Sequence, residues 1–157
     1  AKGDTLVGLP STGLHTNGYS LARSVLFPKY KPTDIFEETG RSIGEELLSI
    51  HKSYLHIVDS IRDKIDIKGM SHITGGGIVG NTMRIIPKGL ELNINWNSWK
   101  RPPIFSFIQQ TGEVPEEDMR KAFNLGIGLV FVIGNQETEK LMELIKHENP
   151  VLLGEVI

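Results

Sequence analysis

The sequence, 157 residues long, contains no cysteine. Disulfide bonds, thiolate metal ligands and a cysteine nucleophile are therefore excluded, and the composition fits a reducing compartment. Long hydrophobic runs are also missing, so no segment reaches the length of a membrane span, and the N-terminus lacks the charged and apolar regions of a signal peptide. We therefore expect a cytoplasmic protein that does not use a membrane as a partner.

An excess of charge of one sign is absent as well. The chain has 17 basic and 19 acidic side chains, which give a formal net charge of -2. Without a strong overall field, nucleic acid is not indicated as a partner, and any phosphate site must be local. A content of 39% hydrophobic and 23% charged residues is typical of one globular domain with a real core.

Two groups of potential metal ligands are explained without a metal. His51 and His56 do not share one face of a helix, because they are five positions apart, and this spacing predicts packed or solvated histidines. The acidic residues Glu116 to Asp118 follow Pro115, where carboxylates complement the dipole of a starting helix. We therefore predict no metal site and a structural role for the acidic run.

What the sequence does contain is glycine, and its most prominent cluster is the triple glycine at residues 75–77. A β-prone run at residues 69–73 precedes it and a helix-compatible segment follows, which predicts a strand, a tight turn and a helix in succession. Backbone N–H groups in such a turn can bind an anion, with phosphate as the natural ligand. The alternative, a sharp corner packed closely without a ligand, remains open from this motif alone.

A second glycine-containing loop, residues 10–18, lies between a predicted strand and a predicted helix. It is dense in turn formers and in small hydroxyl and amide side chains, which suit both a turn and polar contact with a ligand. One interpretation is a helix start capped by Thr16 or Asn17, with His15 solvated. The other is a ligand-binding loop, and the two are compatible.

Hydrophobic patterning predicts strands and helices that alternate along the chain. Strands are predicted at residues 5–9, 69–73, 90–96, 129–133 and 151–156, and helices at residues 19–26, 42–48, 54–65, 104–110 and 136–147. The helix at 42–48 opens with a capping box formed by Ser42 and Glu45. The unbroken apolar run at 129–133 predicts a central strand covered on both faces. Hairpin-like links favour an α+β fold, a mixed sheet covered by helices, over a doubly wound one.

Four ordered strings resemble phosphoribosylformylglycinamidine cyclo-ligase, also called aminoimidazole ribonucleotide synthetase. They are GLHTNGYSLAR at residues 13–23, HITGGG at 72–77, WKRPPIF at 99–105 and FNLGIG at 123–128. Their order and spacing match that family from about residue 4 to residue 156, but only in the C-terminal half of its protein. The resemblance implies the α/β/α layering of that domain, with residues 1–157 as one domain. Ala1 is not an initiator methionine, and we expect a fragment whose N-terminal domain is missing.

The resemblance implies an ATP-dependent ligase that forms a C–N bond in purine biosynthesis. It would convert formylglycinamidine ribonucleotide to aminoimidazole ribonucleotide, ADP and phosphate. ATP and Mg²⁺ would bind mainly through the missing N-terminal domain, which would also form the homodimer of the whole enzyme. We therefore predict that the fragment alone is inactive and that its partners are that domain and the ribonucleotide.

The site residues that the resemblance implies lie in the two glycine loops. His15 and Asn17 are the catalytic candidates, and His15 would either balance phosphate charge or move a proton. The triple glycine turn would hold the phosphate of the ribonucleotide in preference to that of ATP. The implied substrate-binding residues are Ser11, Gly13, Thr16, Gly18, Tyr19, Thr74, Gly75, Gly76 and Gly77.

The chain departs from the family pattern at several positions. Ile50 and His51 stand where the family usually has Pro-Thr, Gly80-Asn81 replaces a usual acidic position, and Met83 replaces a proline before Arg84. Two alternatives stay open. One is a sibling ATP-using enzyme, such as selenophosphate synthetase, thiamine monophosphate kinase or formylglycinamidine ribonucleotide synthetase. The other is a stand-alone phosphate-binding module.

Overall fold

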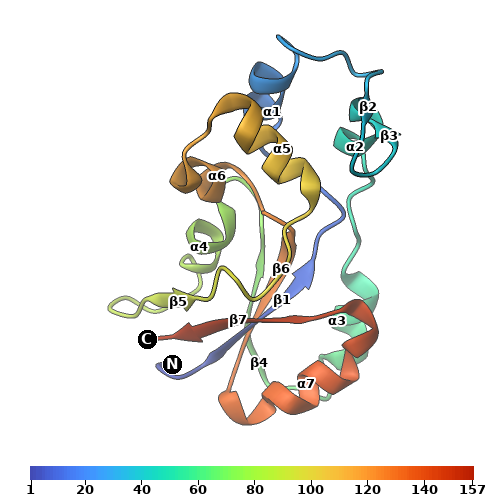
Figure 1. Ribbon diagram of the computed structural model, residues 1–157. Coiled ribbons are helices and arrows are strands. Elements are labelled where there is room, and N and C mark those ends of the chain that lie inside the picture. The colour runs from blue at the N-terminus through green and yellow to red at the C-terminus, as the bar shows by residue number, and fades with distance from the viewer.

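A five-stranded sheet forms the centre of the molecule in the computed structural model, which describes residues 1–157 (Figure 1). Its strands run in the order β4-β6-β1-β7-β5, and every neighbouring pair is antiparallel. The strands are β1 (Thr5–Pro10), β4 (Ile67–His72), β5 (Leu92–Ile94), β6 (Ile127–Ile133) and β7 (Val151–Val156). A separate two-stranded hairpin pairs β2 (Ile35–Phe36) with β3 (Arg41–Ser42).

Seven α-helices and two short 3-10 turns surround this sheet. The helices are α1 (Tyr19–Leu26), α2 (Ile43–Leu47), α3 (Leu55–Ile61), α4 (Gly77–Thr82), α5 (Pro103–Gly112), α6 (Glu116–Ala122) and α7 (Thr138–Leu144). The 3-10 turns η1 (Asn135–Glu137) and η2 (Lys146–Glu148) flank α7. No helix of the structure combines the length and the apolar character that crossing a bilayer requires.

Both faces of the sheet are covered, which confirms the predicted layering. Helices α3 and α7 lie on one side of the sheet and α4 on the other (Figure 1). Val7 and Phe131 pack with residues of α3 and α7, whereas Leu6 and Val130 pack with Ile78 of α4. A further cluster joins α1, α2, α5 and α6 beside the sheet. All seven residues of β6 are buried, as its continuous apolar run predicts for a central strand.

The α+β class is confirmed, but the sheet is antiparallel where a mixed sheet was predicted. β1 and β4 do run parallel to each other, and β6 lies between them, so no two parallel strands are neighbours. The C-terminal ends of β1 and β4 therefore emerge at the end of the sheet where β6 begins, with Pro10 opposite Ile127 and His72 opposite Leu129. This topology brings three glycine-rich segments together.

Local predictions succeed at several element ends and fail at others. The capping box of α2 is confirmed, with Ser42 accepting from the Glu45 N–H and Glu45 accepting from the Ser42 N–H. The strand predicted at residues 90–96 is reduced to three residues, because β5 is an edge strand that pairs only with β7. The helix predicted at residues 136–147 is split into η1, α7 and η2.

Candidate functional site

The loop that follows β1, residues 11–18, is fixed to the segment that precedes β6. The N–H of Ser11 donates to the Gly126 carbonyl at 2.8 Å. Asn124, which is only 2% exposed, donates from Nδ2 to the Gly13 carbonyl at 2.9 Å and accepts the Gly126 N–H at 2.8 Å. The loop is therefore a rigid part of the fold.

Asn17 connects this loop to the triple glycine turn. Its Oδ1 accepts a hydrogen bond from the Gly75 N–H at 3.0 Å, a contact between residues 58 positions apart. The predicted role of Asn17 or Thr16 as the cap of α1 is wrong. Gly18 is the N-cap, in the left-handed conformation, and no side chain caps the helix. The amide Nδ2 of Asn17 is buried and has no hydrogen-bond partner, so it is a donor that the fold leaves unsatisfied.

The triple glycine turn has the predicted strand, turn and helix around it, but its amides are already used. The N–H groups of Gly75, Gly76 and Gly77 donate to Asn17 Oδ1, to the Lys121 carbonyl and to the Thr74 carbonyl. Only the first of these partners is a side chain that a ligand could displace by a rotamer change. The turn therefore matches, in part, the alternative interpretation of a closely packed corner.

His15 is the most buried titratable group of the site, at 3% exposed. Its Nε2 accepts the N–H of Thr12 at 3.1 Å, and its backbone carbonyl accepts from the Tyr19 hydroxyl at 2.8 Å. Burial, followed by the charges of His51 and His72, lowers the pKa of His15 to about 4. At neutral pH the imidazole of His15 is therefore uncharged.

Three histidines from separate segments meet at this point. The rings of His15 and His51 are stacked, with centroids 3.9 Å apart, and Nε2 of His51 lies 3.1 Å from Nε2 of His72. One ring nitrogen from each of the three lies within 4.8 Å of the others. The five-residue spacing of His51 and His56 gave no sign of this cluster.

The structure divides the site residues implied by the sequence into two groups. His15, Asn17 and Gly75 come together, and Thr16 is exposed at the same loop. Ser11, Gly13, Gly18, Tyr19, Thr74, Gly76 and Gly77 also lie at this end of the sheet, but their polar groups or φ angles serve the fold. Tyr19, for example, also donates toward the Leu47 carbonyl, and burial raises its pKa.

Arg84 is a site residue that was not predicted from the sequence. A Cβ built at Gly76 would lie 3.8 Å from its guanidinium Nη2, so this exposed cation stands beside the triple glycine turn. Arg84 forms none of the ion pairs of the structure. Its position just after the short helix α4 was the only signal in the sequence that could have indicated this placement.

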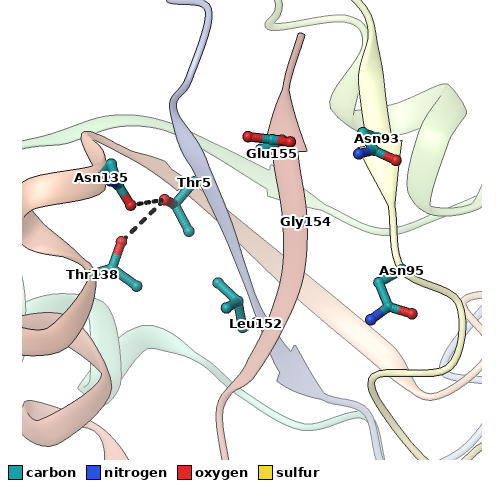
Figure 2. A pocket seen from close by; sticks show the side chains of 8 residues that line it. All are labelled: Thr5, Asn93, Asn95, Asn135, Thr138, Leu152, Gly154 and Glu155. Carbon is teal, nitrogen blue, oxygen red and sulfur yellow. Dashed lines mark hydrogen bonds between the residues drawn. The ribbon is translucent and has the colours of Figure 1, made fainter.

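A different cavity, of about 290 Å³, lies at the opposite end of β1 (Figure 2). Figure 2 shows the hydroxyl of Thr5 bonded to the side chains of Asn135 and Thr138, at 3.3 and 3.0 Å. Because these polar groups satisfy one another and Glu155 is the only titratable side chain in the lining, this cavity is a weaker candidate than the histidine cluster.

The whole chain, residues 1–157, matches the family described as AIR synthase related protein, C-terminal domain. Phosphoribosylformylglycinamidine cyclo-ligase from Thermoanaerobacter sp. is 39% identical over 99% of the chain and 47% of that protein. The proteins of the same name from Geobacillus kaustophilus and Caldanaerobacter subterraneus subsp. tengcongensis are each 42% identical. They match 98% and 100% of the chain, and 46% and 48% of their own lengths.

The chain thus spans about half the length of the curated relatives it matches. Among solved structures, T. maritima PurL complexed with FGAR aligns with 100% of the chain and 24% of its own, with a TM-score of 0.54. Because the identity of that pair is 14%, the likeness shows the fold alone.

Proposed function

The chain belongs to the family of AIR synthase related proteins, as their C-terminal domain, and on that premise we propose that it is half of a phosphoribosylformylglycinamidine cyclo-ligase. The observation that carries the proposal is 39–42% identity to proteins of that name over 98–100% of the chain. The whole enzyme would close the imidazole ring of aminoimidazole ribonucleotide from formylglycinamidine ribonucleotide and ATP. The names of these relatives do not favour the sibling enzymes of the superfamily.

In this reaction ATP phosphorylates the formyl amide oxygen, and the amidine nitrogen then displaces phosphate as the ring closes. Positioning and charge stabilisation carry most of such chemistry. The loop that holds His15 and Asn17 is fixed by buried hydrogen bonds to Asn124, which supports a positioning role. The low pKa of His15 supports a neutral imidazole that accepts or donates a proton, in preference to a fixed positive charge.

The phosphate of the ribonucleotide would bind beside the triple glycine turn. Arg84 supplies a guanidinium there, and the N–H of Gly75 becomes available when Asn17 Oδ1 moves away. The unpartnered Nδ2 of Asn17 would then donate to the ligand. Binding would thus exchange a contact between two parts of the protein for contacts with the substrate.

ATP and Mg²⁺ would bind mainly through the N-terminal half, which would also form the homodimer. Mg²⁺ takes oxygen ligands, chiefly carboxylates and phosphates. The side chains around His15 offer imidazoles, amides and hydroxyls, so this part of the site does not fit Mg²⁺. We therefore assign no step of the reaction to a metal ion held by this chain.

A reconstitution assay tests the proposal. Aminoimidazole ribonucleotide formation is measured for the 157-residue chain alone and after a separately expressed N-terminal half is added. We expect activity only in the mixture, and a loss of about tenfold or more in turnover for Asn17→Ala. The control Asn97→Ala removes an exposed amide and should leave turnover unchanged.

Inactivity of the mixture, with a folded chain that still binds a sugar phosphate, would refute the cyclo-ligase assignment. It would favour a stand-alone binding module or a sibling with another substrate. Equal turnover of the Asn17→Ala and wild-type mixtures would refute the site assignment alone.

A further inference from the structure

The cluster of His15, His51 and His72 has the composition of a metal site. Nitrogen ligands lie about 2.0–2.1 Å from Zn²⁺, so two of them at a tetrahedral angle are about 3.3 Å apart. The 3.1 Å between Nε2 of His51 and Nε2 of His72 is close to that separation. At this contact one ring nitrogen donates a proton and the other accepts it, and an ion can take the place of that proton.

His15 has a ring nitrogen that the protein leaves without a hydrogen-bond partner. When Nε2 accepts the Thr12 N–H, a neutral imidazole carries its proton on Nδ1, which is buried. To bind an ion through Nδ1, the ring must move this proton to Nε2, which then gives up the hydrogen bond from the Thr12 N–H. Leaving a buried donor unpaired is unfavourable by about 1–3 kcal/mol. A structural histidine in a packed core normally has a partner at this atom.

We propose that His15, His51 and His72 bind a divalent transition-metal ion of the zinc class, with three imidazole ligands and one open position. This arrangement is typical of zinc sites that keep a position for water or a ligand. The inference goes beyond the proposed reaction, and its test does not depend on that reaction. While an ion occupies a ring nitrogen of His15, that nitrogen does not accept a proton. It also differs from the sequence-based expectation of no metal, which rested on His51 and His56.

Binding requires a movement that the surroundings allow. The rings of His15 and His51 are stacked with 16° between their planes, so His51 must turn before both lone pairs reach one ion. His51 is half-buried and His72 is exposed, whereas His15 is fixed by burial. The two mobile rings can therefore close on the fixed one and bring the nitrogens to bonding separation.

The electrostatic environment is compatible with a cation. The ammonium group of Lys52, the residue after His51, is paired with Glu148, with Nζ 2.7 Å from a carboxylate oxygen. The cation therefore does not meet an uncompensated positive charge.

The backbone next to His51 is held in place. The Thr12 hydroxyl donates to the carbonyl of the preceding residue, Ile50, at 2.5 Å. His51→Thr therefore removes the third ligand and keeps a polar side chain at this half-buried position.

The test is a titration of the tag-free 157-residue chain, stripped of metal, with Zn²⁺ by calorimetry and with Co²⁺ by visible absorption. We expect one ion per chain and a tetrahedral Co²⁺ spectrum. We also expect His51→Thr and His72→Ala each to weaken affinity by about tenfold or more. His56→Ala is the matched control, because that exposed histidine contacts Glu148 outside the cluster and should have no effect.

Absence of stoichiometric binding, or a loss smaller than tenfold in either cluster variant, would overturn the proposal. An equal loss in His56→Ala would place the ion elsewhere and would also overturn it. His15→Gln tests the third ligand, and unchanged affinity in that variant would overturn the three-imidazole site. If His15→Gln does not fold, His51→Thr and His72→Ala still decide the question, since both positions are accessible to solvent.

Discussion

Glu116 is the carboxylate on which three side chains converge. Arg101 contacts both of its oxygens, Arg120 donates from Nε to Oε1 at 2.7 Å, and Gln109 donates to Oε2 at 3.1 Å. The hydrogen bonds from Arg101, ahead of those from Arg120 and Gln109, lower the pKa of Glu116 from 4.5 to about 2, although burial opposes them. The acidic run therefore has a structural role, as predicted, and Glu116 is the residue that carries it.

This pKa predicts how stability depends on pH. Because the folded-state pKa lies below the unfolded one, the stabilisation is complete above about pH 4.5 and is lost as pH falls toward about 2. The side chain is 37% exposed, so we discount the effect to roughly 1 kcal/mol. Urea unfolding at pH 7 and pH 3 should show that Glu116→Gln destabilises the chain by this amount at pH 7 and much less at pH 3.

Glu117→Gln is the control for this prediction. Glu117 is next in the sequence and 77% exposed, and it meets only Lys121 at 3.7 Å. Its substitution should change stability by a few tenths of a kcal/mol at most. An equal effect of both substitutions would show that net charge, and not the convergence on Glu116, sets the pH dependence.

At the scale of elements, α4 and α6 are placed by the absence of a side chain at Gly77. A Cβ there would lie 1.7 Å from the Arg120 carbonyl oxygen, and the residue has a φ of 65°. This close approach lets the C-terminal end of α6 lie against the triple glycine turn, where the Lys121 carbonyl accepts the Gly76 N–H at 2.9 Å. The turn is thus shaped by helix packing as much as by any ligand.

Substitutions at two glycines of α4 should therefore have opposite effects on the stability of the chain. Gly77→Ala should destabilise the chain by about 2–4 kcal/mol, since it adds a backbone clash to an unfavourable φ. Gly80→Ala should be neutral or stabilising by up to about 1 kcal/mol, because nothing lies within 4 Å of its Cβ. Urea denaturation measures both. Similar stabilities for the two variants would contradict the close approach of α6.

At the level of the whole molecule, three large exposed apolar side chains lie within four residues of His51 in the sequence. Ile50 is 87% exposed, Leu48 is 78% exposed and Leu55 is 68% exposed. Large apolar side chains that are exposed together commonly mark a surface that binds a partner. We propose that the N-terminal half covers this surface when it completes the site around His15.

Ile50→Ser tests that surface. We expect the substitution to weaken association with the N-terminal half by about tenfold, because burial of a large aliphatic side chain is worth about 1.5–3 kcal/mol. The melting temperature of the isolated chain should not change. Leu152→Ser is the control, since Leu152 is 50% exposed at the cavity of Figure 2, beyond the opposite end of β1. Sedimentation velocity of the mixtures measures both affinities.

Elements whose signals are local were predictable from the amino-acid sequence. The apolar run of β6, the capping box at Ser42 and the proline start of α6 each depend on neighbours a few positions away, and each was predicted correctly. Ordered motifs also identified the family, because they record the same local requirements along the whole chain. The length of β5 was overestimated, because its ends are set by pairing with β7 and not by the alternation of apolar and polar residues.

Which polar groups meet, and which stay without a partner, follows from the three-dimensional packing of the chain. His15, His51 and His72 are far apart in the sequence. The parallel course of β1 and β4 on either side of β6 brings the loop with His15 and the end of β4 with His72 to one end of the sheet, where His51 from the link between α2 and α3 joins them. The same packing occupies the amides of the triple glycine turn and leaves Nδ2 of Asn17 unpartnered. Periodicity and turn chemistry are local, whereas hydrogen-bond satisfaction depends on strand order and register.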